Sequence, residues 1–165
     1  MNNQYLFFWQ GPFSQWFRSN FTVGGITFNT CEQYMMYHKA LLFDDNEIAK
    51  QILKTNDPKT QKALGRKVKK FDMAYWNEHC LQIVFRGNHA KFSQNKRLYD
   101  MLMNTSPSLL VEASPFDQIW GIGIDEKTAL MTPAEQWPGT NWLGKTLVNL
   151  RDHFDTEEEI EREDV

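Results

Sequence analysis

TCEQYMMYHKA, residues 30–40, is the stretch on which the fold prediction depends. A small polar residue followed three positions later by Glu or Gln is the pattern of a helix cap. Thr30 with Gln33 has this spacing, and so does Asn29 with Glu32. The positions spaced to form one buried helix face are Cys31, Met35, His38, Leu41 and Leu42. We therefore predict a helix that begins at about residue 30 and buries one side.

The carboxylate of Glu32, in the first turn of this helix, has two explanations. Free N–H groups and the helix dipole favour an ionised carboxylate there, which explains a glutamate by stability alone. Met35, Met36 and Lys39 follow on the same face, at spacings of three, four and seven residues. A carboxylate and an ammonium on one face can line a polar pocket or belong to a surface, and the residues by themselves leave these possibilities open.

The remaining chain predicts a single compact α+β domain that is mostly helical, with a few short strands. TVGGITF, residues 22–28, has the pattern of a β-hairpin with Gly24-Gly25 as its turn. SLLVEAS is a second strand candidate, and WGIGI is either a strand or a glycine-rich loop. Further helices are expected at residues 44–55, 58–65, 72–95, 95–104 and 141–154.

Charge is distributed unevenly along the 165 residues, whose net charge is −3. Residues 155–165, DTEEEIEREDV, contain seven acidic residues and one arginine, so the rest of the chain is net basic. We expect the domain to occupy residues 1–154 and residues 155–165 to form a disordered acidic tail. Residues 50–70 contain eight Lys or Arg and one Asp. Such a basic segment can contact phosphates or form the solvated side of helices.

Several protein classes are excluded by patterns that the sequence lacks. It has no apolar run of about 18 residues, so we expect no membrane segment, and its start does not resemble a secretory signal. Cys31 and Cys80 form neither a CxxC pair nor a zinc spacing, which favours free thiols and a cytoplasmic location. The GxSxG, GxxxxGK[ST], HExxH and GxGxxG motifs are absent, and the four histidines show no ligand spacing. We therefore expect no metal site.

SPFDQIWGIGIDE, residues 114–126, is the second stretch with chemical interest. Ser114-Pro115 favours a turn, and Asp117 lies within it. Trp120 is followed by Gly121, and a glycine allows a ligand to approach the backbone closely. An exposed tryptophan there can stack on a flat ring. The alternative is a strand end with a tryptophan in the core.

Six stretches together resemble one family, and they span roughly residues 7–154. They are PFSQWF, TCEQYMMYHKA, ALGRKV, YWNEHC, LLVEASPFDQIWGIG and NWLGKTLVNLRDHF. The chain resembles the YbiA-like or NADAR family, which is named for a proposed link to NAD and ADP-ribose. The pattern LVEASPxDxxWGxG followed by NxLGxxLxxxR is the specific part of this resemblance.

The resemblance implies an N-glycosidase, which cleaves the bond between a ribose anomeric carbon and a nitrogen, without a cofactor. Two substrate classes are implied: ADP-ribose attached to guanine, with a nucleic acid as its carrier, and phosphoribosylated aminopyrimidine intermediates of riboflavin synthesis. The loop variant of this chain favours the first class. A non-catalytic module that binds NAD or ADP-ribose is the third alternative.

Carried over residue by residue, the family pattern implies Glu32 and Asp117 as catalytic residues. The implied substrate-binding residues are Phe13, Ser14, Tyr34, Lys39, Arg66, Trp76, Trp120, Gly121 and Asn141. An ionised Glu32 would stabilise positive charge on the ribose and orient water. Lys39 and Arg66 would hold phosphate. One departure stands out, because Gln15 follows Phe13-Ser14 where the family often has a shorter asparagine.

Overall fold

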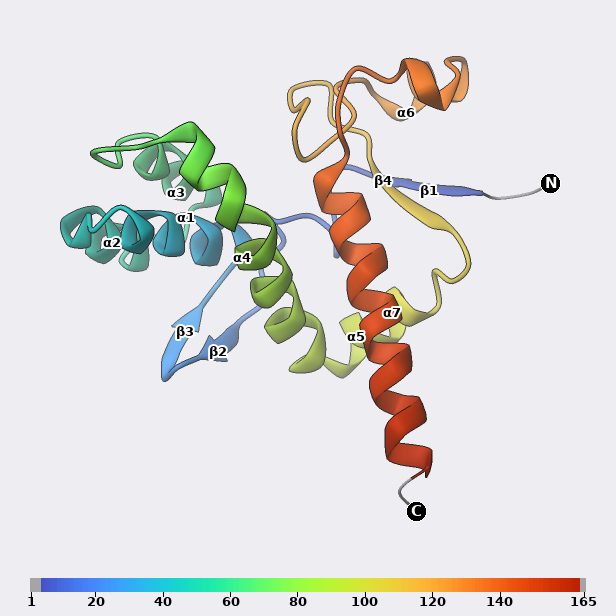
Figure 1. Cartoon of the computed structure of the whole chain (residues 1–165), viewed down its shortest axis with the longest axis horizontal. Coiled ribbons are helices and arrows are strands. Elements are labelled where there is room, and N and C mark those ends of the chain that lie inside the picture. Colours follow the sequence, from blue (N-terminus) through green and yellow to red (C-terminus); the bar gives the residue numbers. More distant parts are fainter. Residues whose placement is uncertain (1–3, 164–165) are drawn as a thin grey trace. The chain divides into compact units, whose positions relative to one another are not determined.

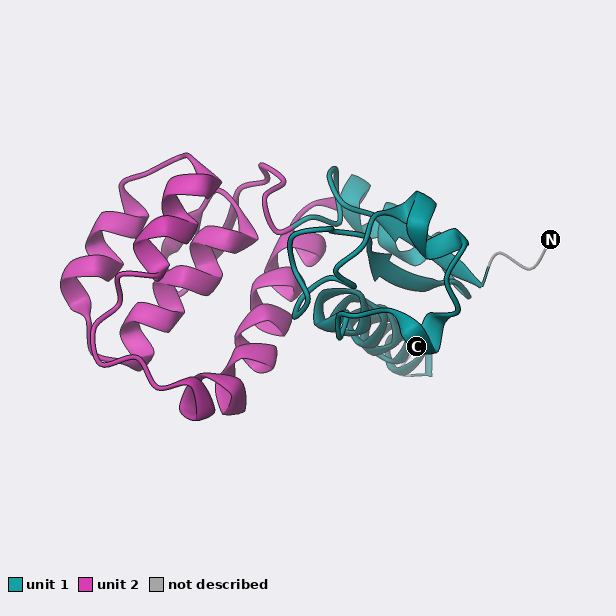
Figure 2. Ribbon diagram, turned by 90° about the horizontal axis from the view of Figure 1, so that it is seen from above, with its two compact units in different colours: residues 1–14, 97–165 teal, residues 15–96 magenta. Residues whose placement is uncertain are grey.

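The computed structural model describes residues 4–163, and the course of the chain is drawn in Figure 1. Contacts within the chain divide it into two compact units, shown in Figure 2. Unit 1 comprises residues 1–14 and 97–165, and unit 2 comprises residues 15–96. Helices dominate and the strands have three or four residues each. The predicted fold class, mostly helical α+β with a few short strands, is confirmed.

Unit 2 consists of a hairpin and four helices. The hairpin strands β2 (Phe21–Val23) and β3 (Ile26–Phe28) are antiparallel, as predicted. Both turn glycines have positive φ, 58° at Gly24 and 80° at Gly25, which is the conformation that a two-residue hairpin turn requires. The helices are α1 (Cys31–Leu42), α2 (Asn46–Leu53), α3 (Pro58–Gly65) and α4 (Met73–Ser93).

The cap of α1 uses Thr30 and Gln33, the first of the two patterns read from the sequence. The Thr30 hydroxyl accepts a hydrogen bond from the Gln33 N–H at 3.0 Å. The Gln33 side chain in turn accepts from the N–H of Asn29, at 2.8 Å. Two otherwise unpaired N–H groups are thereby satisfied, and the start of α1 is held in place. The predicted buried face holds for Cys31 and Met35, but not for Leu41, which is 37% exposed.

Helix α1 is the centre of unit 2, where it packs against α2, α3 and α4. Two glycines permit these close approaches. A Cβ on Gly65 of α3 would lie 1.9 Å from the Met36 sulfur, and one on Gly87 of α4 would lie 2.6 Å from the Tyr34 ring. The core of this unit is formed by Phe21, Phe28, Cys31, Tyr34 and Ala90.

Unit 1 is built around a parallel pair of strands, β1 (Tyr5–Phe8) and β4 (Leu109–Glu112). Its helices are α5 (Lys96–Met103), whose first residue falls in unit 2, α6 (Glu126–Leu130), the 3₁₀ helix η1 (Ala134–Gln136) and α7 (Trp142–Glu163). Helix α7 packs against β4. The segment WGIGI, for which a strand or a loop was expected, is a loop.

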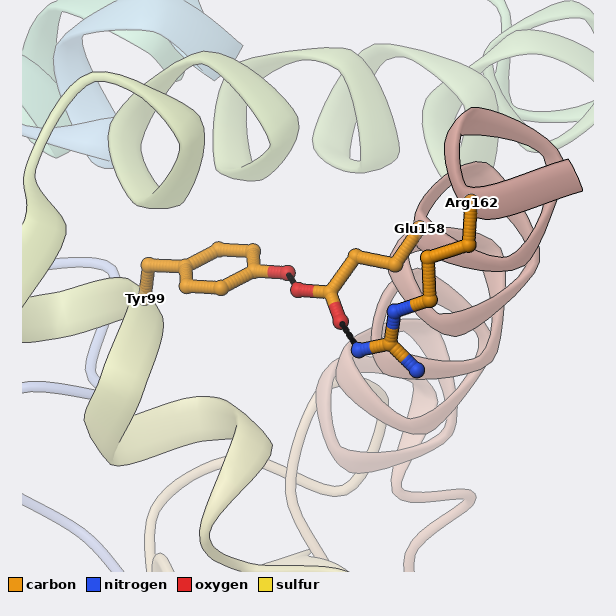
Figure 3. A network of polar contacts seen from close by, with 3 residues as sticks. All are labelled: Tyr99, Glu158 and Arg162. Atoms are coloured by element: carbon orange, nitrogen blue, oxygen red, sulfur yellow. Dashed lines mark hydrogen bonds and ion pairs between the residues drawn. The ribbon is translucent and has the colours of Figure 1, made fainter. Parts of the chain in front are cut away.

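Helix α7 differs from the sequence prediction at its C-terminal end. A helix ending at residue 154 and a disordered tail were expected, but α7 continues to Glu163. Figure 3 shows the contacts that support this extension: the Tyr99 hydroxyl of α5 donates to Glu158, which also accepts from Arg162 at 3.3 Å. Burial and this hydrogen bond raise the pKa of Tyr99 to about 12. The last two residues of the predicted tail lie outside the described residues.

None of the helices in the described part of the chain has the length and apolar character needed to cross a membrane.

Candidate functional site

Glu32 lies in the first turn of α1, and its side chain is buried, with 4% of its surface exposed. Its backbone N–H donates to the carbonyl of Gln15 at 3.0 Å. A buried carboxylate is costly unless nearby dipoles or charges stabilise it. The N-terminus of α1 supplies such dipoles, because its N–H groups point out of the first turn. Burial removes the purely surface explanation for Glu32 that the sequence left open.

Lys39, two turns further along α1, is the charge that faces the same region. Its ammonium lies 4.5 Å from the centre of the Phe71 ring and 5.7 Å from that of Trp76. Burial lowers the pKa of Lys39, Glu32 raises it in partial compensation, and Arg66 lowers it further. Unit 2 therefore holds four predicted site residues, Glu32, Lys39, Arg66 and Trp76, and places the Lys39 ammonium over the Trp76 ring.

The surroundings of Lys39 are suited to a flat or anionic ligand. The Trp76 side chain is buried on α4 and Phe71 is partly exposed just before that helix. An ammonium over aromatic rings is stabilised by their negative faces while its N–H groups remain donors. Arg66, at the end of α3, is exposed. A guanidinium in the open and a half-buried ammonium are together able to hold phosphate oxygens.

Gln15 is a candidate that the sequence reasoning noted only as a departure from the family pattern. Its side chain is buried, and its Oε1 accepts from the amide of Asn88 at 2.8 Å. Its Nε2 has no hydrogen-bond partner among the described residues. A buried donor without a partner costs free energy, so such groups are often explained by a ligand or water. The backbone carbonyl of the same residue accepts from the Glu32 N–H, so Gln15 is tied to the first turn of α1.

Tyr34, which was predicted to contact the substrate, lies in the core of unit 2. Its ring is 3% exposed and packs among core residues, with centroid distances of 5.0 Å to Phe28 and 6.0 Å to Phe21. On the other side it fills the space above Gly87. Its face of α1 points to the core of unit 2, so the structure gives Tyr34 a packing role.

In unit 1, Asp117 organises the loop that follows β4. One oxygen of its carboxylate, Oδ1, accepts hydrogen bonds from the N–H groups of Ile119 and Trp120, each at 2.9 Å. This local turn orients Trp120, whose ring meets that of Trp142 edge-on at 5.7 Å. The half-buried Trp120 therefore belongs to a loop whose conformation is held by hydrogen bonds, and Asp117 has a structural role in addition to any chemical one.

Gly121 and Asn141, two of the predicted substrate contacts, both lie against the backbone of β4. A Cβ on Gly121 would lie 2.9 Å from the Glu112 carbonyl and 3.0 Å from the Asp117 carbonyl, so the close approach is to the protein's own backbone. Asn141 bridges two β4 residues: its amide donates to the Leu110 carbonyl at 2.9 Å, and its oxygen accepts from the Glu112 N–H at 3.0 Å. Its polar atoms thus tie the start of α7 to the strand.

Phe13 and Ser14 are both buried at the end of the first segment of unit 1. The Phe13 ring packs against Phe8, with centroids 5.8 Å apart, and the Ser14 N–H donates to the Gly11 carbonyl at 3.0 Å. Unit 1 thus holds the other group of predicted residues, with Asp117 and Trp120 in one loop.

The NADAR domain family profile matches residues 7–155, which is nearly the whole chain and includes parts of both units. The chain belongs to the NADAR family. The resemblance read from the motifs is thereby confirmed.

Three relatives define what this NADAR chain is similar to. It is 45% identical over 145 residues to the N-glycosidase R617 of Acanthamoeba polyphaga mimivirus, with 85% of each chain covered. It is 29% identical over 144 residues to the N-glycosidase YbiA of Escherichia coli, covering 87% of this chain and 81% of YbiA. The NMR structure of YbiA matches with a TM-score of 0.79 at 27% identity, over 96% of this chain and 89% of YbiA.

The third relative is the riboflavin biosynthesis protein PYRR of Zea mays, 30% identical over 132 residues, which are 76% of this chain but 19% of the maize protein. The two relatives named N-glycosidases confirm the predicted enzyme class. The NADAR chain is a glycosidase that acts on N-glycosyl compounds, and a module that only binds is set aside.

Proposed function

We propose that the substrate of this N-glycosidase is ADP-ribose attached to guanine in a nucleic acid, which the enzyme removes hydrolytically. The observation that carries the proposal is the buried Glu32 carboxylate at the start of α1, with the Lys39 ammonium on the same helix within electrostatic reach. A carboxylate and a cation at one site match the developing positive charge of a ribosyl group and the negative charge of its diphosphate.

The reaction replaces a carbon–nitrogen bond by a carbon–oxygen bond. As the bond between the ribose anomeric carbon and the guanine nitrogen breaks, its electron pair stays on the nitrogen and positive charge develops on the ribose. The Glu32 carboxylate stabilises that charge and accepts a proton from the attacking water. The water oxygen bonds to the anomeric carbon, and the leaving guanine nitrogen takes up a proton. The products are free ADP-ribose and unmodified guanine.

Other residues of the site serve binding in this proposal. Lys39 and Arg66 hold the diphosphate, and the Gln15 Nε2 donates to a ribose hydroxyl or to the water. Trp76 provides a flat surface beside Lys39. In unit 1, the Asp117 carboxylate accepts from the N–H of Trp120, so we assign Asp117 the role of positioning Trp120 in place of the catalytic role first expected.

The choice of a nucleic acid as the carrier is supported by exposed basic residues of unit 2. Along and after α2 and α3, Lys50, Lys54, Lys59, Arg66 and Lys67 are all exposed. Exposed positive side chains attract a phosphate backbone irrespective of base sequence. A small metabolite does not need so many of them.

A second candidate substrate is a phosphoribosylated aminopyrimidine, and the similarity to the maize riboflavin biosynthesis protein favours it. The chemistry at the anomeric carbon is the same, and a single phosphate would bind to Lys39 and Arg66. This candidate leaves the exposed basic residues without a role.

The test is a turnover assay of the protein and its Glu32→Gln variant. Each is incubated with an oligonucleotide carrying ADP-ribosyl-guanine and, separately, with the phosphoribosylaminopyrimidine, and released sugar phosphate is followed by mass spectrometry. We expect release from the oligonucleotide, and a decrease of about 10² or more in kcat for Glu32→Gln, the scale of a catalytic acid or base. Release from the pyrimidine alone would transfer the assignment to metabolite repair. A fully active Glu32→Gln protein would remove Glu32 from the mechanism.

A further inference from the structure

Two aromatic side chains of unit 1 are more exposed than core packing explains. Phe116 is 83% exposed and Trp9 is 43% exposed. Their rings lie side by side, with centroids 5.7 Å apart and planes inclined by 44°. An exposed phenylalanine is costly in water, so a pair of exposed, neighbouring rings indicates a surface that another molecule covers.

The position of the pair follows from the parallel pairing of β1 and β4. The Ala113 N–H donates to the Phe8 carbonyl at 2.7 Å, which extends the pairing just beyond the two strands. Trp9 leaves β1 at the same edge at which residues 113–116 leave β4. The strand pairing therefore presents both rings at the same end of the two strands.

The loop that carries Phe116 is locally held. The Phe116 N–H donates to the Ser114 hydroxyl at 3.2 Å, and Pro115 between them restricts the backbone. Asp117 follows directly, with its carboxylate engaged by Ile119 and Trp120. The exposed ring thus projects from the hydrogen-bonded loop that also contains Asp117 and Trp120, and it is accessible without a rearrangement of that loop.

A cavity of about 490 Å³ adjoins this aromatic pair. It is lined by Phe8, Trp9 and Ala113 and by residues at and near α6, which are Asp125, Glu126, Lys127 and Leu130. Flat apolar walls suit a base, a carboxylate can accept hydrogen bonds from its exocyclic amino group, and an ammonium can pair with a phosphate. These features are complementary to the base and the phosphate of a nucleotide.

We propose that Trp9 and Phe116 form a stacking platform for another nucleobase of the single-stranded segment that carries the ADP-ribosylated guanine. This inference rests on the proposed function and adds a specificity site to it. The platform distinguishes a modified polymer from a modified nucleoside, because only the polymer has another base.

The experiment compares two substrates and three variants. The substrates are a short single-stranded oligonucleotide with one ADP-ribosyl-guanine and ADP-ribosyl-guanosine without flanking nucleotides. The variants are Trp9→Ala, Phe116→Ala and, as a matched control, Met131→Ala, which removes another apolar side chain of unit 1 that is 80% exposed. We expect Trp9→Ala and Phe116→Ala each to raise KM for the oligonucleotide about tenfold, the scale of one lost stacked base. We expect KM for the nucleoside to be the same in these two variants as in the unmodified protein. Met131→Ala should change KM for neither substrate.

Equal effects on both substrates, or none on the oligonucleotide, would overturn the platform while leaving the proposed function intact. Absence of turnover by the unmodified protein would instead overturn the proposed function. In that case, binding of a plain, fluorescently labelled single-stranded oligonucleotide tests the platform by itself. Weaker binding by Phe116→Ala supports the platform, and equal binding by all proteins, or none by the unmodified protein, refutes it.

Discussion

Asn141→Ala tests most directly whether the last motif of the chain serves structure or substrate binding. The side chain makes two hydrogen bonds to β4, to the Leu110 carbonyl and the Glu112 N–H. Its backbone has a φ of 52°, in the left-handed region that asparagine tolerates better than alanine. The substitution therefore removes both bonds and leaves alanine in an unfavourable backbone conformation.

The expected loss of stability follows from these features. Each hydrogen bond contributes about 1 kcal/mol net, and the left-handed conformation costs alanine roughly 1 kcal/mol more. We expect Asn141→Ala to lower the free energy of unfolding by about 3 kcal/mol. With a denaturant slope of roughly 2 kcal/mol per molar urea, the midpoint shifts by about 1.5 M. Asn141→Asp keeps the acceptor for the Glu112 N–H and should lose about half as much.

The assay is urea unfolding followed by far-ultraviolet circular dichroism. The kcat and KM values are measured without urea, at a low temperature at which the variants remain folded. Asn149→Ala, an exposed asparagine on the same helix, is the control and should change stability by less than about 0.5 kcal/mol. If Asn141→Ala were as stable as this control but had a raised KM, the structural interpretation would be refuted and Asn141 returned to the substrate site.

Two further predictions concern the core of unit 2. Lys91 is fully buried, and burial lowers its pKa to about 8 from 10.5. Between these values the unfolded chain binds more protons than the folded one, so this group makes the free energy of unfolding rise with pH by up to about 1.4 kcal/mol per unit. Lys91→Met should lack that rise in urea titrations at about pH 7.5 and about pH 9.5. Burial raises the pKa of Cys31 to about 11, so above the ordinary pKa of a thiol this group makes the free energy of unfolding of both proteins fall with pH. The slopes of the two proteins must therefore be compared with each other, and equal slopes would contradict the prediction. Gly87→Ala should destabilise the protein by about 2 kcal/mol, because the stiff Tyr34 ring cannot move aside. Gly65→Ala should cost less, because the Met36 side chain can rotate away and alanine favours the helix. If thermal unfolding showed Gly65→Ala to be less stable than Gly87→Ala, the rigidity of the Tyr34 ring would not determine the loss of stability.

Local features of unit 2 were predictable because the groups that determine them are close in sequence. The caps at Thr30, Asp45, Asp57 and Asp72 each bind an N–H two or three residues away. The Gly24-Gly25 turn likewise joins strands of adjacent residues. The family motifs predicted the enzyme class and indicated Glu32. They did so because the same residue types recur in the family, and they gave no information about contacts.

Burial and partners of the site residues could not be predicted in this way. The polar atoms of Asn141 are occupied by a strand that lies some 30 positions earlier in the chain. Tyr34 shares α1 with Glu32, but its environment depends on how α4 and the hairpin pack. The continuation of α7 depends on Tyr99 of α5, which is 59 positions from Glu158.

The amino-acid sequence by itself therefore determined where the helices and the hairpin of unit 2 begin, the family, and the carboxylate at the start of α1, because these depend on neighbouring residues or on motif spacing. Tertiary structure alone decided the burial and the hydrogen-bond partners of the motif residues. The pairing of β1 with β4, about 100 positions apart, goes with a contact between Trp9 and Phe116, each of which follows one of these strands. Such a pairing depends on the free energy of the whole fold, so it cannot be predicted from any short stretch of the sequence.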